Sequence, residues 1–173
     1  YRFGAGGSGD AALLTACCHE HKAEAVVCPA STVSGQTVSS TLIRELISDG
    51  KIPFANTLLG RRFSISGKVI HGDARGRTIG FPTVNQLLDP EIVTPLFGVY
   101  ATAVTVGGRM YPAVTNIGIR PTFLLKKPMS ETNIIGFEGD LYGDDIRVEL
   151  LSFLRPETRF DGIDQLKAAI AND

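Results

Sequence analysis

The sequence predicts a mainly β fold, a small antiparallel barrel or sandwich, preceded by a short α/β segment. Nineteen glycines and nine prolines among 173 residues, with no tryptophan, indicate many turns and short strands rather than a helical bundle. After about residue 56, apolar residues alternate with polar ones at a period of two, as in strands buried on one face. Two such runs flank Gly107-Gly108, a dipeptide typical of a two-residue hairpin turn.

The composition excludes several classes of protein. The chain is 43% hydrophobic and 20% charged, enough apolar material for a core, so disorder over most of its length is excluded. A net charge of −1 provides no general attraction to nucleic acid or to anionic membranes. No run approaches the roughly 18 apolar residues of a membrane-spanning helix. Three cysteines, an odd number, fit a reducing cytoplasm better than a disulfide framework.

Helical patterning dominates the first part of the chain. We expect a helix around residues 10–22, an apolar run over 25–28, a polar loop over 29–37 and a helix over 40–49. The second helix is well delimited, because Ser39 is a good N-cap and Gly50 is a natural stop. Its apolar stripe includes Leu42 and Leu46.

Alternating apolar residues mark the strands of the second part. The runs lie around residues 63–69, 99–106, 109–114 and 146–150. A final helix is expected after Asp161, with Ile163, Leu166 and Ile170 on one face. We therefore predict a remnant of one module over residues 1–56 and a barrel domain over residues 57–173.

The segment richest in chemistry is the glycine-rich stretch that ends near residue 85. Glycines let a backbone approach a phosphate closely, and guanidinium groups neutralise the phosphate charge. The candidate phosphate-binding residues are Gly72, Arg75, Gly76, Arg77 and Gly80. The segment is not a P-loop, because the Gly-Lys-Ser/Thr ending is absent. A surface hairpin with solvated charges is the alternative.

Two polar residues close this segment. Thr83 and Asn85 lie two positions apart on an extended segment after Pro82, so their side chains are expected to point the same way. A hydroxyl and an amide oxygen are hard, neutral ligands suited to a Mg²⁺ ion that nucleotide phosphates hold for the most part. Both residues are therefore candidate metal ligands as well as ATP-binding residues.

From about Leu59 to Asp173, the chain resembles the riboflavin kinase domain of the bacterial riboflavin kinase/FAD synthetases. The matching motifs are Leu-Gly-Arg at 59–61, the flap ending at 80–85, and residues 98–100, 116–123, 131–132, 139–143, 153–157 and 159–160. Many ordered motifs make a match far more specific than any single glycine pattern. The family usually has Ala where this chain has Val84; that side chain points away from its two neighbours, so we expect the difference to be tolerated.

The resemblance implies a six-stranded antiparallel Greek-key barrel with a C-terminal helix. It also implies a kinase that converts ATP and riboflavin to ADP and FMN with Mg²⁺. In the family, the Thr and Asn of the flap bind Mg²⁺–ATP, roles that fall on Thr83 and Asn85. The proposed base for the ribityl 5′-hydroxyl falls on Glu131. Phosphoryl transfer needs charge neutralisation, alignment and an oriented hydroxyl, which this set provides. Without the resemblance, Glu131 would be interpreted as a solvated strand carboxylate.

The resemblance also implies a flavin site. The expected flavin-binding residues are Asn116, Arg120, Thr122 and Arg155. For the first three, a rigid turn with a solvated arginine is the alternative; for Arg155, the alternative is pairing with Glu157. We expect Asp140 to cap a turn rather than to bind metal.

The first 50 or so residues resemble the end of the adenylyltransferase module that precedes the kinase in the bifunctional enzymes. Residues 1–4 and 9–10 resemble one motif, and residues 38–44 resemble a phosphate-binding motif at a helix N-terminus. The His-x-Gly-His motif of that module would lie upstream of Tyr1, so we expect no FAD synthesis by this chain alone. A non-catalytic barrel that binds flavin or nucleotide is the remaining alternative.

Overall fold

A computed structural model of the chain describes residues 1–72, 81–119, 127–158, 160 and 162–173. Two compact units divide the chain, Tyr1–Thr37 and Val38–Asp173. Several predicted residues lie outside the described ones: Arg75, Gly76, Arg77, Gly80, Arg120, Thr122 and the expected helix cap Asp161. The domain boundary near residue 56 stays a prediction.

The Tyr1–Thr37 unit contains short, local elements: η1 (Ala5–Gly7), α1 (Ala11–Glu20), β1 (Thr32–Val33) and β2 (Gln36–Thr37). Helix α1 begins where predicted, because the Asp10 carboxylate accepts a hydrogen bond from the Leu13 N–H at 3.0 Å. The β1–β2 hairpin lies within the expected polar loop, and its turn residues Ser34 and Gly35 both have positive φ. The apolar run over 25–28 forms neither helix nor strand.

Two helices precede the barrel in the Val38–Asp173 unit, α2 (Ser40–Ser48) and α3 (Ile52–Leu59). The predicted cap of α2 is confirmed, since Ser39 Oγ accepts a hydrogen bond from the Leu42 N–H at 3.2 Å and Gly50 has a φ of 74°. Helix α3 was not predicted. It contains Pro53 in its first turn, where a missing N–H removes no intrahelical hydrogen bond.

Asn56 joins α3 to the barrel. Its Nδ2 donates to the Leu150 carbonyl at 2.9 Å, and its Oδ1 accepts from the Phe63 N–H at 2.7 Å. The same two helices bury apolar side chains, namely Leu46, Ile47, Ile52, Ala55 and Leu58. Residues 38–56 are thus part of the same compact unit as the barrel.

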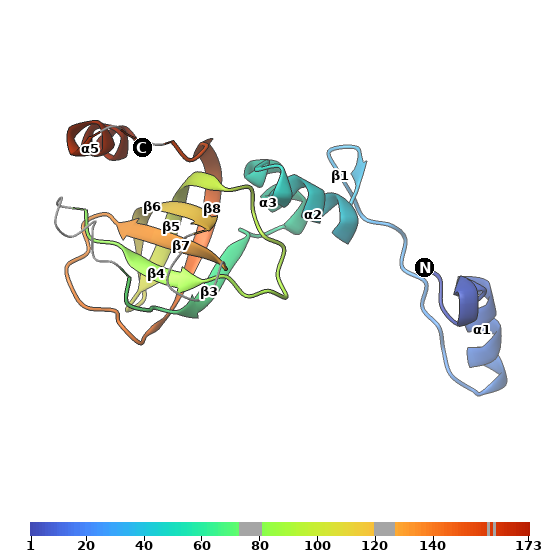
Figure 1. Ribbon diagram of the computed structural model, residues 1–173. Coiled ribbons are helices and arrows are strands. Elements are labelled where there is room, and N and C mark those ends of the chain that lie inside the picture. The colour runs from blue at the N-terminus through green and yellow to red at the C-terminus, as the bar shows by residue number, and fades with distance from the viewer. Residues whose placement is uncertain (73–80, 120–126, 159, 161) are drawn as a thin grey trace. The chain divides into compact units, whose positions relative to one another are not determined.

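Six antiparallel strands form the barrel: β3 (Ser64–Lys68), β4 (Val84–Leu87), β5 (Gly98–Val106), β6 (Arg109–Ile119), β7 (Pro128–Ile134) and β8 (Asp145–Arg155). Their order in the sheet is β3-β8-β5-β6-β7-β4 (Figure 1). Strands β5, β6 and β7 are consecutive neighbours, and β8 returns beside β5, which is the Greek-key arrangement. The predicted hairpin turn is confirmed, with φ values of 57° and 81° at Gly107 and Gly108.

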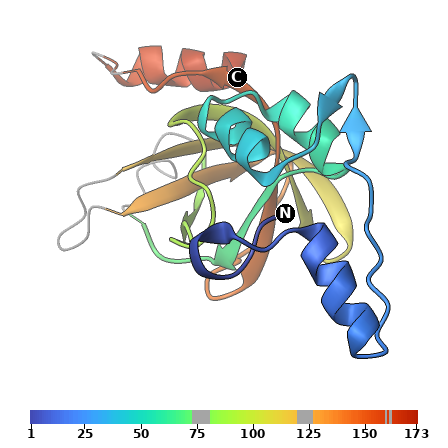
Figure 2. The same cartoon turned by 90° about the vertical axis from the view of Figure 1, so that its right-hand side faces the viewer.

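The two edges of this sheet meet, so the barrel is nearly closed. The Ile70 N–H donates to the Asn85 carbonyl at 2.8 Å, which bridges the end of β3 to β4. Figure 2 shows the sheet curling round on itself. The C-terminal helix α5 (Ile163–Asn172) follows β8. The predicted six-stranded barrel with a C-terminal helix is therefore confirmed. Within the described ranges, no helix is long and apolar enough to cross a membrane.

The barrel interior holds both apolar and hydroxyl side chains. Its apolar core consists of Val69, Val104, Ala113, Ile134, Leu141, Ile146 and Val148. Alongside it, the Thr115 hydroxyl lies 2.9 Å from the hydroxyls of Thr102 and Thr132, and the two hydrogen bonds satisfy these fully buried groups. Because side chains alternate along a strand, residues next to Thr115 and Thr132 point to the outer face.

Tyr100 is the largest side chain that the barrel buries completely. Its hydroxyl donates to the Leu96 carbonyl, and its ring meets the edge of Phe153 at 5.3 Å between centroids. Burial raises the pKa of Tyr100 to about 12. In the folded protein, the charged form of Tyr100 is disfavoured because burial removes the hydroxyl from water.

This pKa predicts a loss of stability in strong base. Tyr100 loses its proton near pH 10 in the unfolded chain and only near pH 12 in the folded chain. Its contribution to the free energy of unfolding is therefore complete below pH 10 and disappears as the pH rises through 12. Between pH 9 and 11.5, the stability of the wild type relative to Tyr100→Phe should fall by about 2 kcal/mol. Urea unfolding at the two pH values measures it, with Tyr142→Phe as the control for an exposed ring. A constant difference would contradict the prediction.

Candidate active site

Three predicted site residues lie side by side across three neighbouring strands. Asn85 on β4 is paired with Glu131 on β7, and Glu131 is paired with Asn116 on β6. Directly paired residues of antiparallel strands project from the same face, about 5 Å apart. Thr132 follows Glu131 and Thr115 precedes Asn116, and both threonines point into the barrel, so Glu131 and Asn116 point outward. Asn85 points outward as well, because it is paired with Glu131. We call Asn85, Glu131 and Asn116 the polar row.

Glu131 lies at the centre of the polar row and is half-buried. On one side stands the amide of Asn85, and on the other the amide of Asn116. Segments far apart in the sequence therefore bring a carboxylate between two neutral amides. This arrangement places hydrogen-bonding groups on both sides of the carboxylate that is predicted to act as the base.

Asn85 is only 5% exposed although it faces outward. Gly72 lies directly over it, since a Cβ at that glycine would come within 2.4 Å of Asn85 Nδ2. A side chain at position 72 would displace the Asn85 amide from its present position. The glycine predicted to bind phosphate thus lies against the predicted metal ligand.

Thr83 is half-buried and immediately precedes β4, two residues before Asn85. That the two side chains point to the same face stays a prediction from their spacing. Asn133 on β7 holds this segment, because its Nδ2 donates to the Pro82 carbonyl at 2.7 Å. The two candidate ligands are therefore presented by a segment that is tied to the strand of Glu131.

A carboxylate from beyond the end of β8 holds Asn116. The Asn116 Nδ2 donates to Oε1 of Glu157 at 2.9 Å. Gly118 provides the space, since a Cβ there would lie 2.4 Å from the same oxygen. Sequence reasoning missed this contact and considered pairing Glu157 with Arg155 instead. No local signal could have found it, because it depends on where the chain returns after β8.

Arg155 lies in register with the polar row by way of Val99 on β5, which is paired with Asn116. Its guanidinium makes two hydrogen bonds to the Asp173 carboxylate, at 2.8 and 2.6 Å. Asp173 raises the pKa of Arg155 above its ordinary value, and the hydrogen bonds between the two side chains are the main cause. These bonds tie the end of α5 to β8, and flavin binding by Arg155 stays a prediction.

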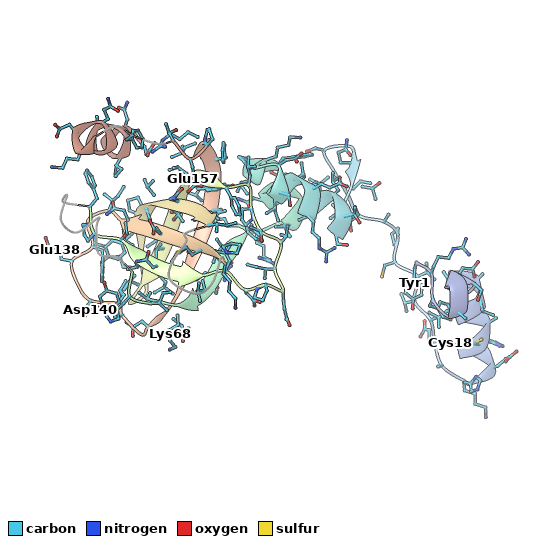
Figure 3. All side chains as sticks on the ribbon, viewed as in Figure 1. Tyr1, Cys18, Lys68, Glu138, Asp140 and Glu157 are labelled. Carbon is cyan, nitrogen blue, oxygen red and sulfur yellow. The ribbon has the colours of Figure 1, made fainter. Side chains whose placement is uncertain are left out.

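Asp140 lies between β7 and β8 and is not part of the polar row. Its Oδ1 accepts a hydrogen bond from the Tyr142 N–H at 2.9 Å, so it caps a turn as expected. The Tyr142 ring stacks on His71 with 3.8 Å between centroids. Figure 3 shows Asp140 at the end of the barrel opposite Glu157.

Comparison with known proteins identifies the family. Residues 59–173, which contain all six strands of the barrel and the whole polar row, match the family described as riboflavin kinase, or flavokinase. The chain belongs to the riboflavin kinase family. The resemblance seen in the sequence motifs is thereby confirmed, and residues 59–173 are its riboflavin kinase domain.

Relatives with this domain carry a second activity in their names. A "bifunctional riboflavin kinase/FMN adenylyltransferase" from Escherichia coli K12 is 42% identical over 174 residues, covering 100% of this chain and 55% of the relative. The protein of the same name from Bacillus subtilis is 42% identical over 145 residues, covering 82% of this chain and 46% of the relative. The chain spans about half the length of these relatives.

A solved structure shares the fold of the whole chain. It comes from Streptococcus pneumoniae, has a TM-score of 0.86 and 35% sequence identity, and is covered to 56% by this chain, all of which aligns. Its title describes a macrolide-efflux protein. The riboflavin kinase domain of the present chain thus has the architecture of an experimentally determined structure.

Proposed function

We propose that the riboflavin kinase domain transfers the γ-phosphoryl group of ATP to the ribityl 5′-hydroxyl of riboflavin, which gives FMN and ADP. The polar row carries this proposal. It places one carboxylate between two amides across two strand spacings, roughly 10 Å. Membership of the riboflavin kinase family supports the same reaction.

In this proposal, Glu131 accepts a hydrogen bond from the ribityl 5′-hydroxyl. This bond directs a lone pair of the hydroxyl oxygen at the γ-phosphorus. The new P–O bond forms as the bond to the β,γ-bridging oxygen breaks, and ADP leaves. The hydroxyl proton passes to the Glu131 carboxylate. In a loose transition state this transfer is late, so orientation contributes more than deprotonation.

The remaining predicted residues divide between the two substrates. Gly72, Arg75, Gly76, Arg77, Gly80, Thr83 and Asn85 are assigned to ATP, and Asn116, Arg120, Thr122 and Arg155 to the flavin. The position of Gly72 against Asn85 supports a common nucleotide site for those two residues. The assignments outside the described ranges stay predictions that rest on the sequence.

Thr83 and Asn85 fit a Mg²⁺ ion by the chemistry of their donors, because hydroxyl and amide oxygens are hard ligands. Across the described parts of the chain, no group of three or more His, Cys, Asp and Glu side chains is placed to hold a metal. The negative charge in the coordination sphere would thus come mainly from nucleotide phosphates. When bound, Mg²⁺ would neutralise charge that develops on the transferring phosphoryl group.

Metal binding is therefore expected to depend on nucleotide. Two neutral ligands compete poorly with water for Mg²⁺, so the protein alone should bind the ion only at millimolar concentrations. With ADP present, the affinity should rise at least about tenfold above that of ADP alone. Isothermal titration calorimetry with Mg²⁺, with and without ADP, measures this, and Asn85→Leu should abolish the gain. Micromolar binding without nucleotide would contradict the prediction.

A single assay tests the proposed function against a non-catalytic barrel. The purified chain is incubated with riboflavin, ATP and Mg²⁺, and the products are separated by liquid chromatography. We expect FMN and ADP in equal amounts, with no FMN when ATP is omitted. Binding of riboflavin without any FMN would favour a flavin-binding barrel that does not catalyse the reaction.

A second candidate function concerns the adenylyltransferase activity that the relatives' names carry. Relatives that align with the whole chain, including the Tyr1–Thr37 unit, are named as FMN adenylyltransferases as well as kinases. We propose that an upstream adenylyltransferase module makes FAD in the full-length protein. The full-length protein should form FAD from FMN and ATP, and this chain alone should stop at FMN.

The cytoplasm, where the three free cysteines stay reduced, remains the predicted compartment.

A further inference from the structure

Among the described residues, three buried side-chain oxygens have no hydrogen-bond partner: Gln86 Oε1, Ser130 Oγ and Asn116 Oδ1. The last of them belongs to the polar row. Oδ1 of Asn116 is inaccessible to solvent, and no described residue donates to it. Buried polar atoms are nearly always paired, because an unpaired one loses its hydration without compensation. The oxygen belongs to the residue directly paired with Glu131. It is therefore a candidate acceptor for a donor on a bound substrate.

The orientation of this amide is determined by its neighbour. The Glu157 carboxylate can only accept hydrogen bonds, so it must face the Nδ2 of Asn116 rather than the Oδ1. Gly118 leaves the space in which that carboxylate lies against β6. Glu157 thus selects one of the two amide orientations, in which Oδ1 points away from the Glu157 carboxylate.

We propose that Glu157 is a positioning residue that acts through Asn116. It holds the amide so that Oδ1 accepts a hydrogen bond from a ribityl hydroxyl of riboflavin. Glu131 is assigned the reacting 5′-hydroxyl, and Asn116 is its direct cross-strand neighbour, so the hydroxyl concerned is the adjacent 4′-hydroxyl. The pair would select flavins with a polyhydroxyl chain and align that chain for attack. This inference rests on the proposed kinase function.

Steady-state kinetics of Glu157→Ala test the proposal, with riboflavin and ATP varied in turn. We expect the riboflavin KM to rise about tenfold, as for one lost substrate hydrogen bond, with an unchanged ATP KM. Glu157→Gln should stay within about threefold of the wild type, because its Oε1 still accepts from Asn116 Nδ2. Glu138→Ala is the matched control, since this exposed carboxylate lies on another part of the barrel (Figure 3).

Two further variants separate positioning from a general loss of structure. Gly118→Ala keeps Glu157 but displaces its carboxylate, and should raise the riboflavin KM without lowering the melting temperature by more than a few degrees. In the Asn116→Ala background, Glu157→Ala should have no additional effect, because the residue through which it acts is gone. A 4′-deoxyribityl flavin should bind the wild type and Glu157→Ala equally.

The outcomes are distinct from those of the function assay. Absence of FMN with the wild-type chain would refute the proposed function itself. An active wild type with an unchanged riboflavin KM in Glu157→Ala would overturn the positioning role alone. Additive effects of Glu157→Ala and Asn116→Ala would also overturn it, since they would show that Glu157 acts independently of Asn116.

Discussion

Replacement of Glu131 by Gln is expected to slow FMN formation by about 10²-fold, at the lower end of what a positioned general base contributes. Gln keeps the shape of the side chain and can still bond the hydroxyl, but it cannot take its proton. The effect is modest for a base because the nucleophile is little deprotonated in a loose transition state. ATP affinity should hardly change, since the carboxylate faces the acceptor alcohol in our proposal.

Single-turnover FMN formation by Glu131→Gln, measured beside its ATP affinity, checks this expectation. Glu138→Ala is a useful comparison, because Glu138 is an exposed carboxylate beyond the end of β7 and outside the polar row. A rate close to that of the wild type would refute the catalytic assignment. Loss of ATP affinity with unchanged turnover would move Glu131 to a binding role.

Replacement of Gly98 by Ala is expected to destabilise the barrel by about 3–4 kcal/mol, because it combines backbone strain with a steric clash. Gly98 has a φ of 148°, and a Cβ there would lie 2.5 Å from the carbonyl oxygen of Arg155 and 2.7 Å from the Phe153 ring. The oxygen belongs to the backbone of β8 and cannot move without separating β5 from β8. Val99 follows Gly98 directly and is paired with Asn116, so the strain would reach the polar row.

Thermal unfolding measures this effect, and the melting temperature should fall by about 10 °C for a domain of this size. Gly162→Ala is the matched control, since its Cβ would meet nothing within 4 Å and its φ is not in the positive range; it should cost less than about 1 kcal/mol. An equal loss in both variants would show that the contact between Gly98 and β8 is not the cause.

Much of the fold could be predicted from the sequence because its signals are local. Ser39 caps a helix through an atom three residues away, and the Gly107-Gly108 turn needs only its own two positive φ angles. The period-two runs likewise report burial on one face. Helix α3 escaped prediction because Pro53 is usually a helix breaker, and only its place in the first turn makes it acceptable.

The candidate site divides in the same way. Thr83, Asn85, Glu131 and Asn116 were identified by residue type, spacing and resemblance to a family, without any knowledge of distances. That three of them form a row is a matter of strand register. Register depends on which faces of distant strands become buried together, and a slip of one residue would turn Glu131 into the barrel.

By itself, the sequence determined the helix caps, the hairpin turn, the alternation of the strands and the chemical types available for catalysis, because each depends on neighbours along the chain. Only the tertiary structure decided that Gly72 covers Asn85, that Arg155 bonds Asp173 and that Glu157 holds Asn116. These contacts join segments that meet only after the barrel has closed. Their physical cause is the pairing and packing of the whole sheet, which no local pattern contains.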